Sequence, residues 1–122
     1  MVENTNARED LRRHKRIDTN LPIQYKNIRK TGENPIGSLT RNLSEGGVCF
    51  KSGEFISLAC RLVLEITIPT SPKPIKAISK VAWIRKLPAG DQYELGNQFL
   101  EMAKEDKANI MNFVNNVFGT TV

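Results

Sequence analysis

The first residues that could bind an anion form a basic run at residues 11–16, LRRHKR. The run holds four fixed positive charges, one histidine and no acid. Arg12 and Arg16 are four residues apart, and each guanidinium is a planar fork that can grip two phosphate oxygens or stack on a purine base. Lysine supplies charge without this flat geometry. The run is therefore either a solvated basic tail or an arm that binds a nucleotide.

A second candidate is the turn sequence NLSEGG at residues 42–47. Asn42 and Ser44 have short polar side chains that either fold back on the local backbone or face outward to donate and accept hydrogen bonds. Gly46 and Gly47 can adopt a positive φ and admit a flat ligand close to the main chain, since neither has a Cβ. A simple tight turn would use the same residues, so this motif alone does not establish a ligand site.

No arrangement of residues in the sequence indicates an enzyme or a metal centre. The single histidine, His14, lies inside the basic run, and no pair of carboxylates occurs in a recognisable motif. Cys49 and Cys60 lack C-x-x-C spacing and a neighbouring histidine, so both are expected to be buried as small apolar residues. We therefore expect a binding protein without catalytic chemistry, metal or cofactor.

Period-two alternation of apolar and polar residues predicts about six strands that would carry these motifs. The connections between them are too short for crossover helices, which favours antiparallel pairing. Only the last segment, residues 103–117, has the three- and four-residue spacing of a helix, and Gly119 is a suitable stop. This pattern predicts a compact barrel or curled sheet with one amphipathic helix. The strands are expected at residues 21–26, 36–43, 48–50, 61–68, 75–86 and 93–102.

The same alternation assigns faces to the aromatic side chains. Trp83 has the parity of the apolar residues that precede it in its strand, so it is expected to point into the core. Phe50, Tyr93 and Phe99 are expected there as well. Gly96, in the last strand, marks a bulge or a close approach of other atoms to the backbone.

The composition indicates one folded domain with an anionic partner. Of the 122 residues, 39% are apolar and 25% charged, as is usual for a soluble globular protein. The net charge of +5 favours nucleic acid, acidic lipid or a phosphorylated small molecule. No apolar run is long enough to span a membrane, and the polar N-terminal residues lack the apolar stretch of a signal peptide. We expect a cytoplasmic protein without membrane insertion.

The two candidate motifs together resemble the signature of the PilZ domains, a family that binds the bacterial second messenger cyclic di-GMP. That signature is R-x-x-x-R followed by [D/N]-x-S-x-x-G, and both parts match here, at residues 12–16 and 42–47. Residues 81–83 (VAW) are similar to the family's V-x-W strand, and residues 96–99 (GNQF) to its G-x-x-F strand. The likeness extends over residues 11–118.

The resemblance implies a mainly β fold, a six-stranded antiparallel PilZ-type β-barrel with a C-terminal α-helix. The PilZ domain would occupy residues 11–118, between a flexible leader at residues 1–10 and a tail at residues 119–122. Leu11 stands where many relatives place a further arginine, which favours one ligand molecule per chain. Asn42 stands where the family often has aspartate, so a neutral amide replaces a carboxylate acceptor.

The resemblance also assigns residues to the ligand, cyclic di-GMP. The arm would clamp phosphates and guanine, the turn would engage a guanine edge, and ordering of the arm would change the surface offered to an unidentified downstream protein. The residues assigned to the arm are Arg12 and Arg16, with Arg13 as a further candidate. Those assigned to the turn are Asn42, Ser44 and Gly47, with Gly46 as a further candidate.

Two other functions stay open. A small basic barrel could bind single-stranded nucleic acid, but this would need surface aromatics as stacking platforms, and the aromatics here are expected in the core. Nucleic acid is therefore not the expected partner. A ligand-free PilZ-like module could instead bind a protein through the helix face around Met111 and Phe113. The chain is expected to be a monomer, or a weak homodimer formed through the helix or a barrel edge.

Overall fold

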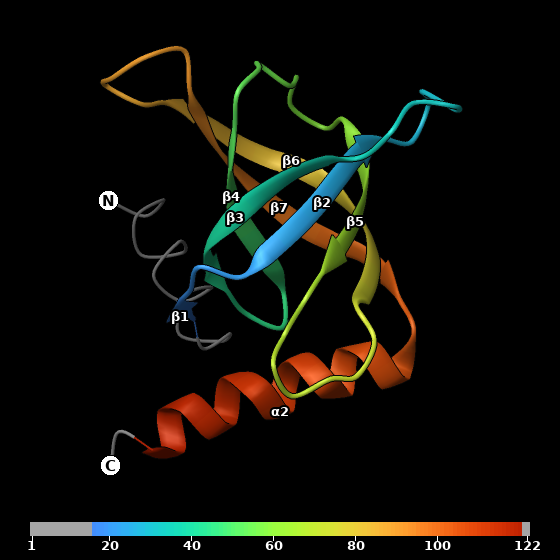
Figure 1. Ribbon diagram of the computed structural model, residues 1–122, viewed down its shortest axis with the longest axis vertical. Coiled ribbons are helices and arrows are strands. Elements are labelled where there is room, and N and C mark those ends of the chain that lie inside the picture. Colours follow the sequence, from blue (N-terminus) through green and yellow to red (C-terminus); the bar gives the residue numbers. More distant parts are fainter. Residues whose placement is uncertain (1–15, 121–122) are drawn as a thin grey trace, which may run out of the picture.

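The computed structural model describes residues 16–120, which form an antiparallel β-barrel with one helix (Figure 1). This confirms the predicted fold class. The leader predicted at residues 1–10 lies outside the described residues. The elements are β1 (Ile17–Asp18), β2 (Pro22–Asn27), β3 (Ile36–Leu43), β4 (Gly47–Ser52), β5 (Arg61–Ile66), β6 (Ile75–Lys86), β7 (Tyr93–Met102) and α2 (Lys104–Thr120).

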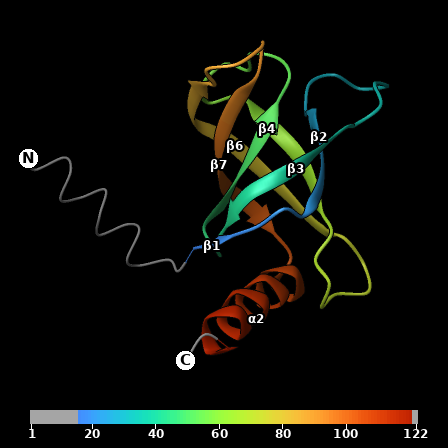
Figure 2. The same ribbon diagram turned by 60° about the vertical axis from the view of Figure 1, so that its left-hand side comes forward.

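The barrel closes because β3 pairs with strands on both of its sides. Neighbouring strands follow the order β3, β2, β5, β6, β7 and β4, and β4 then pairs back to β3. The short β1 precedes β2 in the chain and pairs with the end of β3, with Ile17 opposite Leu43. The sequence did not predict β1, because two residues are too few to show an alternating pattern. β1 fixes the chain that follows the basic run beside the β3–β4 turn (Figure 2).

The interior of the barrel is filled by the alternate side chains of its strands. Tyr25 and Phe50 meet there with ring centroids 4.8 Å apart, and the Tyr25 hydroxyl lies 3.0 Å from Ser52 Oγ. Burial raises the pKa of Tyr25, so this hydroxyl stays protonated and can donate a hydrogen bond. The fully buried aliphatic residues of the strands and of the β5–β6 connection are Ile23, Leu43, Leu62, Leu64, Ile66, Ile68, Ile75, Val81 and Leu95.

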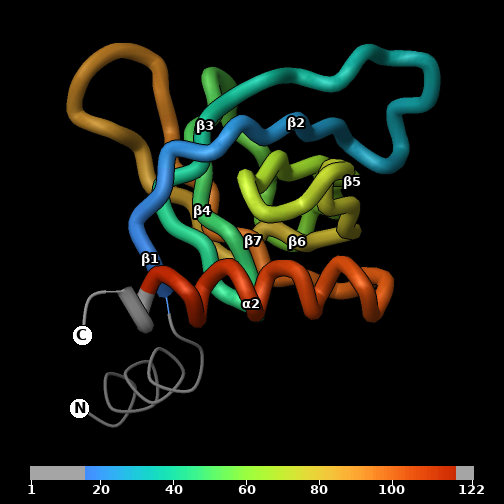
Figure 3. Tube along the Cα trace, turned by 60° about the horizontal axis from the view of Figure 1, so that its bottom comes forward, coloured from blue at the N-terminus to red at the C-terminus, as the bar shows by residue number. Residues whose placement is uncertain are grey.

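The helix α2 runs across one end of the barrel (Figures 1 and 3). Ile110 and Val114, four residues apart on one helix face, are buried against the core, and Phe113 is partly buried beside them. The helix continues to Thr120, one residue beyond the predicted stop at Gly119. Within residues 16–120, no helix is long and apolar enough to span a membrane.

An irregularity between β6 and β7 changes the direction of Trp83. Val81 pairs with Asn97 and Trp83 pairs with Gly96, so Ala82 is an extra residue in β6 and forms a bulge. The bulge reverses the alternation, and Trp83 lies on the outside of the barrel with 41% of its surface exposed. The prediction that Trp83 points into the core is therefore wrong. Phe50 is fully buried, as predicted, and Tyr93 and Phe99 pack partly buried against the core.

Candidate functional site

The β3–β4 turn is held in shape by the side chain of Ser44. The Ser44 amide donates to the Gly47 carbonyl at 2.9 Å, which closes the turn. Ser44 Oγ accepts from the amides of Gly46 and Gly47 at 3.1 and 3.2 Å, and the residue is only 6% exposed. The Phe99 amide donates to the Gly46 carbonyl at 3.0 Å and so ties the turn to β7. These hydrogen bonds therefore make the turn rigid.

Gly47 is required by the packing of β4 against β7. A Cβ at this position would stand 2.1 Å from the Asn97 carbonyl oxygen. Backbone oxygen cannot rotate out of the way as the end of a side chain can. The glycine at the end of the turn thus has a structural reason as well as the ligand role assigned to it by resemblance.

The indole of Trp83 covers the backbone of Gly96. A Cβ on residue 96 would lie 2.1 Å from the indole atoms Cε2 and Nε1, so only glycine lets the ring lie this close. The close approach predicted for Gly96 is confirmed. Since 41% of Trp83 is exposed, the outer wall of the barrel carries an aromatic platform.

The turn and the indole border one hollow of about 880 Å³. Its other walls are formed by Cys49, by residues 96–102 of β7, by Arg16 and by Lys107. Of the predicted site residues, the structure therefore brings together Arg16 and the turn residues Ser44, Gly46 and Gly47.

The remaining predicted site residues are Asn42, Arg12 and Arg13. Asn42 does not line the hollow. Its partner in the β3–β4 strand pairing, Cys49, does line it. Arg12 and Arg13 lie outside the described residues. Sequence reasoning noticed residues 81–83 and Gly96 but did not assign Trp83 to the site, because period-two counting placed its side chain inside the barrel.

The floor of the hollow includes a buried cysteine that is not a nucleophile. Burial, and to a smaller extent the charge of Glu94, raise the pKa of Cys49 to about 11. The charges of Arg41, Arg16 and Arg85 act in the opposite direction. The thiol is therefore protonated at neutral pH. No three His, Cys, Asp or Glu side chains gather to form a metal site within residues 16–120. The hollow combines the exposed cation Arg16, the aromatic plane of Trp83 and the backbone groups of the turn. This combination suits a flat anion.

We expect Ser44→Ala to destabilise the protein by about 1 kcal/mol, because the amides of Gly46 and Gly47 both lose their acceptor. Urea denaturation monitored by circular dichroism measures the change. The matched control is Ser57→Ala, since Ser57 is exposed and its side chain makes no hydrogen bond with another described residue. Equal stability of both variants would show that Ser44 does not hold the turn.

Comparison with known proteins identifies the fold. The family model for the PilZ domain matches residues 10–116. The inhibitor of motility MotI/DgrA from Bacillus subtilis superposes with a TM-score of 0.74 at 20% sequence identity, over 88% of this chain and 51% of that one. The PilZ domain of YcgR from Escherichia coli, solved with c-di-GMP, gives 0.67 at 14% identity, over 89% and 92% of the two chains.

A third solved structure has the same fold. It is the MrkH–c-di-GMP complex of K. pneumonia, with a TM-score of 0.67 at 14% identity over 89% of this chain and 53% of that one. The chain thus spans about half the length of MotI/DgrA and of MrkH, but nearly all of the YcgR domain. A search of curated proteins finds no match.

Proposed function

The chain belongs to the PilZ domain family, and on this basis we propose that it is a receptor for cyclic di-GMP which binds in the hollow beside the β3–β4 turn. The observation that carries the proposal is that Arg16, the glycine-containing turn and the exposed Trp83 all border one hollow. Cyclic di-GMP offers flat guanines and charged phosphates, which match an aromatic platform and an arginine fork.

Each predicted residue receives a role in this proposal. Arg12 and Arg16 grip phosphate and guanine, with Arg13 in support, because a guanidinium can do both. Asn42 offers an amide to a guanine edge, and Gly46 and Gly47 let the base approach the main chain. The Ser44 hydroxyl hydrogen has only a long 3.4 Å contact with the Gly47 carbonyl, so it can donate to the ligand while Oγ holds the turn.

Binding would act as a signal without chemistry. Arg16 immediately precedes β1, which pairs with the end of β3 next to the turn, so the arm enters at the rim of the hollow. Ordering the arm costs roughly 1–2 kcal/mol of backbone entropy per residue, which charge-assisted bonds and stacking would offset. The ordered arm would present a new surface to a downstream protein in the cytoplasm.

Isothermal titration calorimetry with cyclic di-GMP tests the proposal, with cyclic di-AMP as the control ligand. We expect saturable binding of cyclic di-GMP, with one molecule per chain, and much weaker binding of the adenine analogue. The absence of saturable heat with cyclic di-GMP would remove the receptor function and favour a ligand-free interaction module.

Binding should also quench the fluorescence of Trp83, the only tryptophan in the chain, because a guanine would stack on its exposed face. Trp83→Leu should weaken binding by about 1–3 kcal/mol, the usual contribution of one base on an aromatic platform. Phe55→Leu is the control, since Phe55 is 60% exposed but does not line the hollow. Unchanged emission at saturating ligand would place the binding site elsewhere.

The exposure of Trp83 also favours a second candidate, the binding of single-stranded nucleic acid. Titration with a fluorescent oligonucleotide over a salt series separates the two candidates. Tight oligonucleotide binding with a steep salt dependence, and no response to cyclic di-GMP, would support this candidate.

A further inference from the structure

A buried carboxylate joins two arginines on the outer face of the barrel. Glu94 of β7 is 4% exposed, although it is a charged residue. Its Oε2 lies 3.2 Å from Arg41 Nε of β3, and its Oε1 accepts from Arg85 Nη2 of β6 at 2.5 Å. The side chains of both arginines stay open to solvent, at 47% and 65% exposure. We call these three residues the Glu94 cluster.

The two guanidinium groups of the cluster keep most of their donors. Each guanidinium has five N–H donors, and Glu94 is held through one nitrogen of each. The other nitrogens have no hydrogen bond or ion pair with another residue in the part of the chain that the structure describes. The cluster has a net charge of +1, because two arginines meet one acid. It therefore presents unsatisfied donors and positive charge to an incoming anion.

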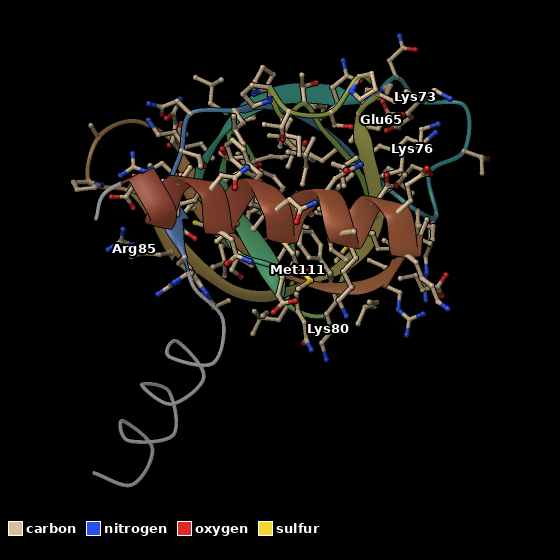
Figure 4. All side chains as sticks on the ribbon, turned by 90° about the horizontal axis from the view of Figure 1, so that it is seen from below. Glu65, Lys73, Lys76, Lys80, Arg85 and Met111 are labelled. Carbon is tan, nitrogen blue, oxygen red and sulfur yellow. The ribbon has the colours of Figure 1, made fainter. Side chains whose placement is uncertain are left out.

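The Glu94 cluster continues the face of the barrel that carries the hollow. Glu94 lies two residues before Gly96 on β7, and Arg85 lies two residues after Trp83 on β6, so these pairs share a face with a spacing of about 7 Å. Cys49, on the wall of the hollow, is close enough to Glu94, Arg41, Arg85 and Arg16 for their charges to act on its thiol. Figure 4 shows Arg85 projecting outward on the side of the barrel where β1 lies.

The cluster is suited to binding because its geometry exists before a ligand arrives. A free arginine loses side-chain entropy when it grips a phosphate, whereas an arginine already held by a carboxylate loses less. Exposed ion pairs contribute little to stability, and both arginine partners of Glu94 are exposed. Stability alone thus gives little reason to bury one acid between two arginines beside a hollow.

We infer that Arg41 and Arg85, positioned by Glu94, form a phosphate-binding site at the border of the hollow, and that a phosphate of cyclic di-GMP occupies it. The inference rests on the proposed function and adds residues that belong to neither the arginine arm nor the turn. The ligand would then be held by the Glu94 cluster in addition to the arm and the turn.

Calorimetric titration of arginine variants with cyclic di-GMP tests the inference. Arg41→Gln and Arg85→Gln should each weaken binding about 10-fold, which corresponds to one charge-assisted hydrogen bond. Arg85→Lys should recover part of the loss, since lysine keeps the charge but not the fork. The matched control is Arg61→Gln. Arg61 is exposed on β5 and does not line the hollow, so this substitution removes the same charge at a different place.

The outcomes separate the inference from the proposed function. Weaker binding in both glutamine variants at an unchanged melting temperature supports the site. Affinity and stoichiometry equal to those of Arg61→Gln overturn the inference while leaving the receptor function intact. Absence of binding by the native protein overturns both.

Discussion

Replacing Arg16 by alanine is expected to weaken cyclic di-GMP binding by about 100-fold or more. Arg16 borders the hollow and is exposed, so its guanidinium is available for a bidentate contact with phosphate, and two charge-assisted bonds account for a loss of this size. Arg12→Ala should have a similar effect, because the motif pairs the two residues. Calorimetric titration with cyclic di-GMP measures both losses.

The melting temperature of the ligand-free protein distinguishes a binding role from a structural one. Arg16 makes no hydrogen bond or ion pair with another residue within the described range, so Arg16→Ala should change stability by no more than about 0.5 kcal/mol. Arg29→Ala, in an exposed turn outside the hollow, serves as the matched control. A large drop in the melting temperature of Arg16→Ala would mean that the arm is part of the fold and that its assignment to the ligand is wrong.

Gly47→Val is expected to lower the free energy of unfolding by about 3 kcal/mol or more. Its Cβ would overlap the Asn97 carbonyl oxygen at 2.1 Å, so β4 and β7 would have to separate beside the hollow. Chemical denaturation of the ligand-free protein gives the change directly. Binding of cyclic di-GMP should be lost along with the rim of the hollow.

Gly37→Val is the matched control for this substitution. A Cβ at Gly37 meets no atom within 4 Å, and the residue is exposed on β3, so the same added side chain should be tolerated there. If Gly47→Val is as stable as Gly37→Val but binds no ligand, Gly47 serves the ligand alone. If both variants keep full stability and affinity, the turn is not part of the site.

The strands and the helix were predictable from the sequence because their signals are local. The alternation in β5, where Leu62, Leu64 and Ile66 are buried, follows from period two, and the spacing of Ile110 and Val114 follows from the helical period. Closure into a barrel followed from many short strands and from the family resemblance. β1 was missed, since Ile17–Asp18 is recognisable only by its pairing with β3.

The site was less predictable because it depends on contacts between distant strands. A single extra residue, Ala82, turned Trp83 from the core to the surface, and no count of alternating residues detects such a bulge. The Glu94 cluster was not anticipated at all. Its members come from β3, β6 and β7, and only the strand order brings Arg41 and Arg85 to the same carboxylate.

The turn shows how one short motif can serve both fold and ligand. The sequence of the turn predicted either a tight turn or a ligand contact, and the structure has the tight turn. Ser44 Oγ accepts hydrogen bonds from two amides, and Gly47 packs against β7. This does not remove the ligand role. A rim that is already rigid binds with a smaller loss of entropy.

The most direct measurement is a two-dimensional ¹H–¹⁵N correlation spectrum of the protein titrated with cyclic di-GMP. The indole N–H of Trp83 gives a single signal, because the chain has one tryptophan. We predict that this signal and the amide signals of Gly46 and Gly47 shift together and saturate at one equivalent, while those of the β2–β3 loop at residues 29–34, at the opposite end of β3, stay in place. Saturable shifts confined to that distant loop, or no shifts at all, would contradict binding in the hollow.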